Sequence, residues 1–341
     1  MTRVYVGMSG GVDSSVTAAL LVEQGYDVTG VYMKNWTQDL PGMKCPWADD
    51  LADAKRVAVQ LDIDFKVFDF EKEYKQNVVD YMIDEYKAGR TPNPDIMCNQ
   101  EVKFKLFLEA AVADGADMIA TGHYARTQDG RLLRAKDENK DQTYFLYRVT
   151  KAALEKTLFP LGGYTKEEVR ELAKERGLYT ATKKESMGIC FVGKVGIRDF
   201  LSQYIETVPG KIIDRRSGEV LGYHEGAIFY TIGQRHGLDV GGGLPYYVTG
   251  KDMDKNEVYV TTQLNDEGLW KKAIQLQSLH WINDIPADGE YQIRIRHRAP
   301  LIAAQLQGSR VELVESQRAV TAGQSVVIYD GDICLGGGIV H

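Results

Sequence analysis

RVYVGMSGGVDSS, residues 3–15, is the stretch of sequence that decides the fold. Val4, Val6 and Met8 alternate with other residues as they would in a β-strand, and helical spacing of apolar residues begins near Ser14. A glycine-rich turn from a strand into a helix directs backbone N–H groups and the positive end of the helix dipole at one point. No lysine follows the glycines, so this is not the GxxxxGK[ST] loop. The stretch therefore predicts a loop suited to binding an anion.

The pattern SGGxDS in residues 9–14 resembles the pyrophosphate-binding loop of the PP-loop ATP pyrophosphatases. Enzymes of that superfamily split ATP between the α- and β-phosphates and adenylylate an acceptor, usually a carbonyl or carboxylate oxygen. Serine and glycine also make ordinary turns, but the position of this loop and its fixed residues agree with the superfamily. The resemblance implies an enzyme that uses ATP.

The composition sets outer limits on the class of protein. A chain of 341 residues exceeds the usual size of one domain, so we expect two or three. Hydrophobic residues at 44% and charged residues at 26% are ordinary for a soluble globular protein. We expect a cytoplasmic protein without a membrane partner, because no apolar stretch is long enough to span a bilayer and the start shows no signal-peptide pattern. The net charge of −7 argues mildly against nucleic acid as a partner, although local patches matter more.

Strand-like and helix-like segments alternate in the first half of the chain. The expected strands are 28–33, 65–70 and 117–121, and the expected helices are 49–61, 71–87 and 104–113. Residues 91–95, TPNPD, are expected to be non-helical because two prolines restrict themselves and their predecessors. This alternation predicts an α/β fold with a doubly wound, mostly parallel sheet and a site at the carboxyl ends of its strands.

The second half changes from helices to short strands. Helices are expected at 165–176, with Thr165 as N-cap, and at 198–205. Short β-like pieces and glycine turns follow residue 209, and strands at 291–298, 311–315 and 325–329 indicate an antiparallel barrel or sandwich. We place an ATP-binding domain at 1–206, a small β-rich central domain at 207–271 and a C-terminal β-barrel at 272–341.

The four cysteines, Cys45, Cys98, Cys190 and Cys334, form no CxxC pair, so zinc is not expected. Cys98 precedes a predicted helix and has Lys103 and Lys105 nearby in sequence, which can favour a thiolate, but a buried structural cysteine is equally compatible. Cys190 alone is more typical of a buried strand cysteine. Together, Cys98 and Cys190 could flank one ATP site and relay sulfur through a persulfide and a transient disulfide.

Eight segments make the whole chain similar to the bacterial tRNA-specific 2-thiouridylases. These segments are GMSGGVDSS, VYMKNW, AGRTPNPDIMCNQEVKF, ATGHYAR, NKDQTYFLY, MGICFVG, YTIGQRHGL and GQSVVIYDGDICLGGGI. The resemblance implies an adenine nucleotide α-hydrolase-like PP-loop domain and thiolation of C2 of the wobble uridine, position 34, in the tRNAs for Lys, Glu and Gln. Mg-ATP would adenylylate the uracil O2, sulfur would attack C2, and AMP would leave.

The same resemblance implies roles for individual residues. ATP would be bound by Gly7, Met8, Ser9, Gly10, Gly11, Val12, Asp13, Ser14, Met33 and Gly122, and Asp13 would help to hold Mg²⁺. Asn93, Pro94 and Asp95 would meet the target base, with Asp95 as a general acid or base. Cys190 would carry a persulfide from a sulfur-donor protein, and Cys98 would be the second catalytic thiol. Further tRNA contacts are implied for His123, Lys140, Asp141, Gln142, Arg296, His297 and Gln324.

Three arginines, Arg294, Arg296 and Arg298, would share one face of a strand and could contact tRNA phosphates. A solvated barrel face is the alternative. If Arg296 and His297 both contact tRNA, the regular strand must end or bulge there. Met187 departs from the family, which more often has a small hydroxyl residue at that position.

Two other functions compete with tRNA thiolation. A PP-loop ligase or amidotransferase that adenylylates a small molecule would need neither the two thiols nor an RNA-binding barrel. A nucleotide-sensing RNA-binding protein without catalysis would tolerate the loss of both thiols. The sequence does not identify the sulfur donor, and a monomer is the default expectation.

Overall fold

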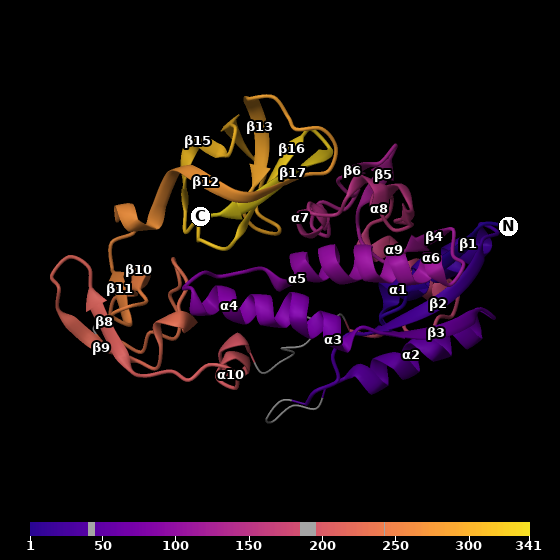
Figure 1. The fold of residues 1–341 in the computed structure, drawn as a ribbon, viewed down its shortest axis with the longest axis horizontal. Coiled ribbons are helices and arrows are strands. Elements are labelled where there is room, and N and C mark those ends of the chain that lie inside the picture. Colours follow the sequence, from indigo (N-terminus) through magenta and orange to yellow (C-terminus); the bar gives the residue numbers. More distant parts are fainter. Residues whose placement is uncertain (40–44, 185–195, 242) are drawn as a thin grey trace.

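The structure is a computed structural model that describes residues 1–39, 45–184, 196–241 and 243–341 (Figure 1). A five-stranded parallel sheet in the order β3-β2-β1-β4-β7 forms the centre of the N-terminal part. Its strands are β1 (Arg3–Gly7), β2 (Asp27–Lys34), β3 (Asp64–Asp69), β4 (Met118–Ala120) and β7 (Thr157–Leu158). Val4 and Val6 on the central strand β1 are fully buried, as expected for a sheet covered on both faces. The predicted α/β class is confirmed.

Helices cover this sheet and extend away from it toward the rest of the molecule (Figure 1). The first group is α1 (Val12–Glu23), α2 (Trp47–Gln60), α3 (Glu71–Tyr74), η1 (Lys75–Asp80), α4 (Tyr81–Lys87), α5 (Pro94–Met97), η2 (Cys98–Leu106) and α6 (Phe107–Ala113). The second group is α7 (Thr143–Leu146), α8 (Lys151–Glu155), α9 (Lys166–Glu175) and α10 (Ile197–Leu201). Thr165 caps α9 in a complete capping box with Glu168, which confirms its predicted role.

One predicted helix boundary is wrong for a physical reason. The helix expected from 104 begins ten residues earlier, at Pro94, and therefore includes part of the segment expected to be non-helical. Proline suits the first position of a helix because its missing N–H is one that no helical carbonyl would accept. Both η1 and η2 are π-helical segments within longer helices, which the sequence pattern did not indicate.

A second sheet of four strands, in the order β10-β11-β8-β9, follows in the chain. It contains β8 (Gly210–Asp214), β9 (Val220–His224), β10 (Tyr247–Asp252) and β11 (Glu257–Thr261), and the 3₁₀ turns η3 (Ala227–Phe229) and η4 (Glu267–Leu269) flank it. Its small apolar core includes the fully buried Ile212, Val248 and Val258. In Figure 1 this sheet lies at the end of α4 that is remote from the parallel sheet.

Six antiparallel strands form a closed barrel in the C-terminal part. They are β12 (Trp270–Trp281), β13 (Gly289–Arg294), β14 (Ile302–Gln307), β15 (Arg310–Arg318), β16 (Ser325–Asp330) and β17 (Ile333–Val340). The barrel closes because β12 pairs with both β15 and β17. Strand β13 ends at Arg294, so the regular strand expected through residue 298 is wrong, and the three arginines do not form one strand face.

A hairpin from the N-terminal part continues the sheet of the barrel. Its strands are β5 (Arg126–Gln128) and β6 (Arg131–Leu133), and β6 pairs with β17. The hydroxyls of Tyr144 and Tyr147 also bond Ser325 on β16. The barrel is thus fixed to the parallel-sheet part by backbone and side-chain contacts. None of the described helices has the length and apolar character that crossing a membrane requires.

Candidate active site

The loop between β1 and α1 packs closely against α2. Gly10 has a positive φ of 73°, and a Cβ at this position would lie 2.4 Å from the carbonyl oxygen of Asp50. Ser9 N donates to Ser14 Oγ at 3.2 Å, and Ser14 Oγ in turn bonds the carbonyl of Gly11. Gly11 is the N-cap of α1 and provides no side-chain acceptor, so no capping side chain competes with an anion for the first N–H groups of α1.

Gly122, two residues after β4, packs closely against this loop. A Cβ at Gly122 would lie 2.9 Å from Ser14 N, so only glycine permits this approach. Met33 at the end of β2 packs against Gly7 in the same way, with its Cε 2.9 Å from where a Cβ of Gly7 would be. The ends of β1, β2 and β4 consequently open into one cavity of about 460 Å³. This is the position expected for a site in a parallel sheet.

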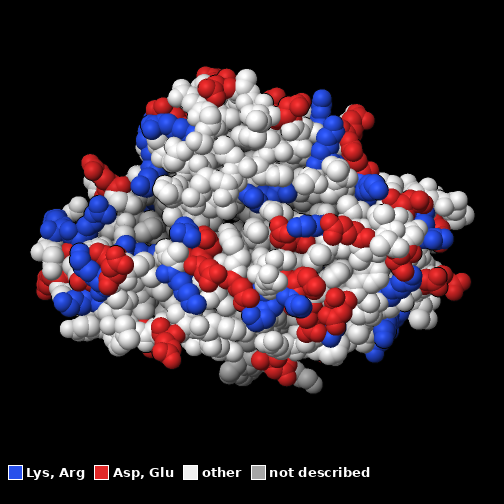
Figure 2. All heavy atoms as spheres, in the orientation of Figure 1, with Lys and Arg blue, Asp and Glu red and all other residues white. Residues whose placement is uncertain are grey.

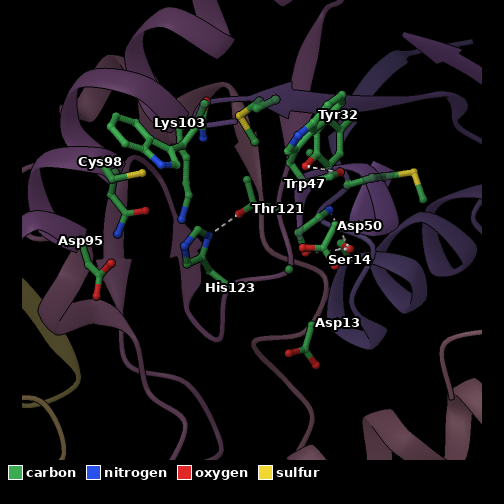
Figure 3. Close-up of a pocket in the computed structure, with 18 of the residues that line it drawn as sticks. Asp13, Ser14, Tyr32, Trp47, Asp50, Asp95, Cys98, Lys103, Thr121 and His123 are labelled. Atoms are coloured by element: carbon green, nitrogen blue, oxygen red, sulfur yellow. Dashed lines mark hydrogen bonds between the residues drawn. The ribbon is translucent and has the colours of Figure 1, made fainter. Parts of the chain in front are cut away.

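Much of the predicted nucleotide and thiolation set lines this cavity (Figure 3). The predicted residues in its wall are Gly7, Met8, Ser9, Asp13, Ser14, Met33, Asp95, Cys98, Gly122, His123 and Gln142. Gly10, Gly11 and Val12 lie in the same loop but outside the wall. Cys190 and Met187 lie outside the described residues.

Asp13 is held by two neighbours. Both of its carboxylate oxygens accept hydrogen bonds from Lys166 Nζ, at 2.6 and 2.8 Å, and Oδ1 also accepts from the hydroxyl of Tyr124 at 2.9 Å. The Lys166 side chain is buried. Among the described residues, no three His, Cys, Asp or Glu side chains gather in a way that could hold a metal ion. A magnesium site built on Asp13 does not fit this arrangement, and we derive no step through one.

Asp95 enters the cavity from the first turn of α5. The side chain of Asn93 caps this helix by accepting from Asp95 N at 3.2 Å, and Pro94 occupies the first helical position. Burial raises the pKa of Asp95 above its ordinary value, and the nearby charge of Lys103 partly offsets that effect. A buried carboxyl that exchanges a proton closer to neutral pH is suited to general acid–base chemistry.

Cys98 is the first residue of η2, directly after α5, and its buried thiol lies in the cavity wall. The next residue, Asn99, donates from Nδ2 to the carbonyl of Phe145 at 3.1 Å and so connects η2 to α7. Phe145 also lines the cavity. The wall around the thiol is therefore continuous from α5 to α7.

His123 and Gln142 also line the cavity. The imidazole Nδ1 of His123 lies 2.7 Å from the hydroxyl of Thr121, and its ring packs between Phe104 and Phe159. Complete burial lowers the pKa of His123 well below its ordinary value, so the ring is neutral near pH 7. Gln142 accepts from the backbone N–H of Tyr124 at 2.9 Å. Neither residue carries a charge toward the cavity.

The remaining predicted tRNA contacts lie outside the cavity wall. They are Asn93, Pro94, Lys140, Asp141, Arg296, His297 and Gln324. Several of these side chains join the barrel to the N-terminal part instead of projecting into solvent. Gln324 donates to the carbonyl of Thr91 at 2.7 Å, and the ring of His297 lies 4.5 Å from that of Phe145. Burial and neighbouring arginines lower the pKa of His297 to about 4.

Asp141 and Arg294 form an ion pair inside the molecule. The distance from Arg294 Nη1 to Asp141 Oδ2 is 2.7 Å, and both side chains are almost completely buried. Arg294 is therefore not part of an exposed phosphate-binding face, which is a correction of the sequence prediction. In this structure the carboxylate of Asp141 is not at the surface.

Other residues that line the cavity were not predicted as site residues from the sequence. Asn35 and Trp36 follow the end of β2, within the VYMKNW segment, and the rule that sites lie at the carboxyl ends of strands could have indicated them. Cys45 is buried and also lines the cavity, and Cys334 is fully buried in the core. Basic and acidic side chains alternate over the face seen in Figure 2, without a continuous basic track.

Family models match the chain in three consecutive parts. Residues 2–194 match a model described as a tRNA methyl transferase HUP domain, residues 198–262 a tRNA methyl transferase PRC-barrel domain, and residues 271–340 an aminomethyltransferase beta-barrel domain. These three ranges coincide with the parallel sheet and its helices, the four-stranded sheet and the closed barrel.

Two curated relatives match almost the whole chain. A Streptococcus thermophilus protein named tRNA-specific 2-thiouridylase MnmA is 48% identical over 355 residues, which cover 99% of this chain and 95% of that protein. The Bacillus subtilis protein of the same name is 48% identical over 352 residues, with the same two coverages. A solved 4-thiouridine synthetase–RNA complex with bound ATP is 19% identical with a TM-score of 0.40, covering 59% of this chain and 50% of that one. A structural match at this level supports no inference.

Proposed function

Since this chain belongs to the tRNA-specific 2-thiouridylase family, we propose that it replaces O2 of the wobble uridine, position 34, by sulfur in the tRNAs for Lys, Glu and Gln. The main support is that the SGGxDS loop, the Asp95 carboxyl and the Cys98 thiol line one cavity. An ATP-activating loop and a thiol at one cavity match an adenylylation followed by a sulfur transfer. A ligase acting on a small molecule has no need of that thiol.

The proposed first step activates the base. The target uridine leaves the anticodon stack, at a cost of a few kcal/mol, and enters the cavity. Asp95 takes the N3 proton while the uracil O2 attacks the α-phosphorus of ATP, and pyrophosphate leaves. The loop from Gly7 to Ser14 holds the phosphates through backbone N–H groups, and Met33 and Gly122 border the adenosine.

The proposed second step transfers sulfur. A persulfide-carrying donor protein loads Cys190, and the Cys98 thiolate attacks the inner sulfur of that persulfide. The sulfur–sulfur bond of the persulfide breaks, hydrosulfide leaves, and a disulfide joins the two cysteines until a thiol reductant cleaves it. Hydrosulfide attacks C2, and AMP leaves with the former O2. The proton on sulfur passes to solvent while N3 regains the proton held by Asp95, which gives 2-thiouridine. We propose that the enzyme works as a cytoplasmic monomer.

The deciding experiment measures 2-thiouridine in tRNA from cells whose only copy carries Cys190→Ser. We expect no detectable 2-thiouridine, because serine cannot carry a persulfide. Cys45→Ser, which changes a thiol outside the proposed sulfur relay, is the control and should retain the modification. Mass spectrometry of the nucleosides distinguishes sulfur from a methyl group, which matters because two of the matching family models are described by methyl transfer. Normal thiolation in the Cys190→Ser strain would refute the persulfide role.

Two neighbouring glycines allow a sharp test of the ATP loop. Gly10→Ala would force a Cβ to 2.4 Å from the Asp50 carbonyl at a positive φ, whereas a Cβ at Gly11 meets only Ser9 Oγ at 3.5 Å. Backbone strain of about 1–3 kcal/mol in the ATP-binding conformation of the loop predicts a loss of ATP affinity of about 5- to 150-fold for Gly10→Ala. Gly11→Ala should change stability by no more than about 1 kcal/mol and affinity very little. Calorimetric titration with ATP measures both variants, and equal losses would contradict the assignment of the loop.

A further inference from the structure

The charges in the cavity wall leave one lysine unpaired. Asp13 is paired with Lys166, and Asp50 is paired with Lys183 Nζ at 2.8 Å. Lys103 is the one lysine or arginine among the described wall residues, and within the described part of the chain its ammonium makes no hydrogen bond or ion pair. Its charge acts on the Asp95 carboxyl without forming an ion pair with it, so this half-buried cation is only partly compensated until a further anion completes its environment.

The π-helical geometry of η2 places Lys103 and Cys98 on the same side of the helix. In an α-helix, residues five apart are rotated by about 140° from each other, because each residue turns the chain by about 100°. In a π-helix the i→i+5 bonding places them one turn apart on the same side. Lys103 is five residues after Cys98, and both line the cavity. π-Helical turns within α-helices often occur at functional sites.

The position of Lys103 within the cavity indicates which anion its charge stabilises. Figure 3 shows Asp95, Cys98, Lys103 and His123 on one side of the cavity, and Asp13 on the other. The charge of Lys103 acts on the carboxyl of Asp95 and on the imidazole of His123. Burial shifts Asp95 toward its neutral form, His123 is neutral, and the loop after β1 supplies its own anion donors. The cation therefore matches negative charge that arises at the thiol.

We propose that Lys103 is a further catalytic residue, whose ammonium stabilises the thiolate of Cys98 before it attacks a persulfide. This inference rests on the proposed function. The thiol proton passes to solvent, the electron pair stays on sulfur, and the cation lowers the energy of that anion. Lys105, also near Cys98 in sequence, cannot do this, because it points outward and pairs with Glu101 at 2.8 Å.

The test measures the pH dependence of alkylation of Cys98 by iodoacetamide, with mass spectrometry of the Cys98 peptide as readout. Lys103→Met keeps the apolar stem and should raise the midpoint pH of alkylation by about one unit, as expected for the loss of an opposite charge close to a titrating group. Lys103→Arg should keep the midpoint near that of the unaltered protein. Lys105→Met is the matched control and should leave it unchanged.

A second measurement separates the thiol from the nucleotide. We expect Lys103→Met to slow formation of 2-thiouridine by about 10²-fold while tRNA-dependent ATP–pyrophosphate exchange is retained. An unchanged alkylation midpoint would overturn the inference, and so would a loss of exchange as large as the loss of thiolation, because the cation would then act on ATP. The alkylation measurement requires neither ATP nor tRNA, so failure of the proposed function leaves it interpretable.

Discussion

Asp95→Asn is expected to slow formation of 2-thiouridine by about 10²–10⁴-fold, the usual contribution of a general acid or base. Asparagine has nearly the same shape, and the backbone N–H at this position can still bond the cap residue Asn93. The side-chain amide of asparagine at position 95 cannot take the N3 proton of the base. The loss should therefore fall on the chemical step, and single-turnover rates with saturating ATP and tRNA measure it directly.

The pH dependence of the same rate gives an independent check on Asp95. Because burial raises the pKa of this carboxyl, the unaltered enzyme should lose activity on acidification at a higher pH than an ordinary aspartate would cause. The base form is the deprotonated one, so activity falls as pH drops through the raised pKa. Asp95→Asn should lack this acid limb. A loss below about tenfold, or an unchanged pH profile, would argue against a proton-transfer role.

Local patterns in the sequence were sufficient to predict much of the architecture. The loop at residues 9–14, the alternation of strands and helices and the Thr165 cap each depend on residues close together in the chain. The same locality explains the error at Pro94, because proline disfavours helix interiors yet suits a first turn. Deciding between the two requires knowing where the helix starts.

Contacts between distant segments could not be predicted in this way. Alternation along residues 294–298 gives the side chains a common face but does not say whether that face meets solvent or another domain. Arg294 pairs with a carboxylate 153 residues away, and the hairpin at 126–133 joins a strand near the C-terminus. The π-helical register of η2, which puts Lys103 on the same side of the helix as Cys98, likewise cannot be found by a search for 3.6-residue periodicity.

Arg294→Met is expected to lower the free energy of unfolding by about 3–5 kcal/mol, the usual cost of removing one partner of a buried ion pair. It would leave the Asp141 carboxylate buried with only neutral donors, including the hydroxyl of Thr143 at 2.9 Å. Urea unfolding followed by circular dichroism measures this change. Arg298→Met is the matched control. Within the described part of the chain, exposed Arg298 donates only to the backbone carbonyl of Asn139, so its loss should cost no more than about 0.5 kcal/mol.

The double variant Asp141→Asn with Arg294→Met distinguishes an internal role of Asp141 from the tRNA contact that family resemblance implies. Removing both charges should recover much of the stability lost in Arg294→Met, because no uncompensated charge stays buried. If Asp141 acts only inside the protein, by fixing the segment that carries Gln142 and Phe145 to the barrel, tRNA affinity should recover together with stability. If its carboxylate also contacts tRNA, stability should recover while affinity stays low, and a binding titration at fixed salt separates these outcomes.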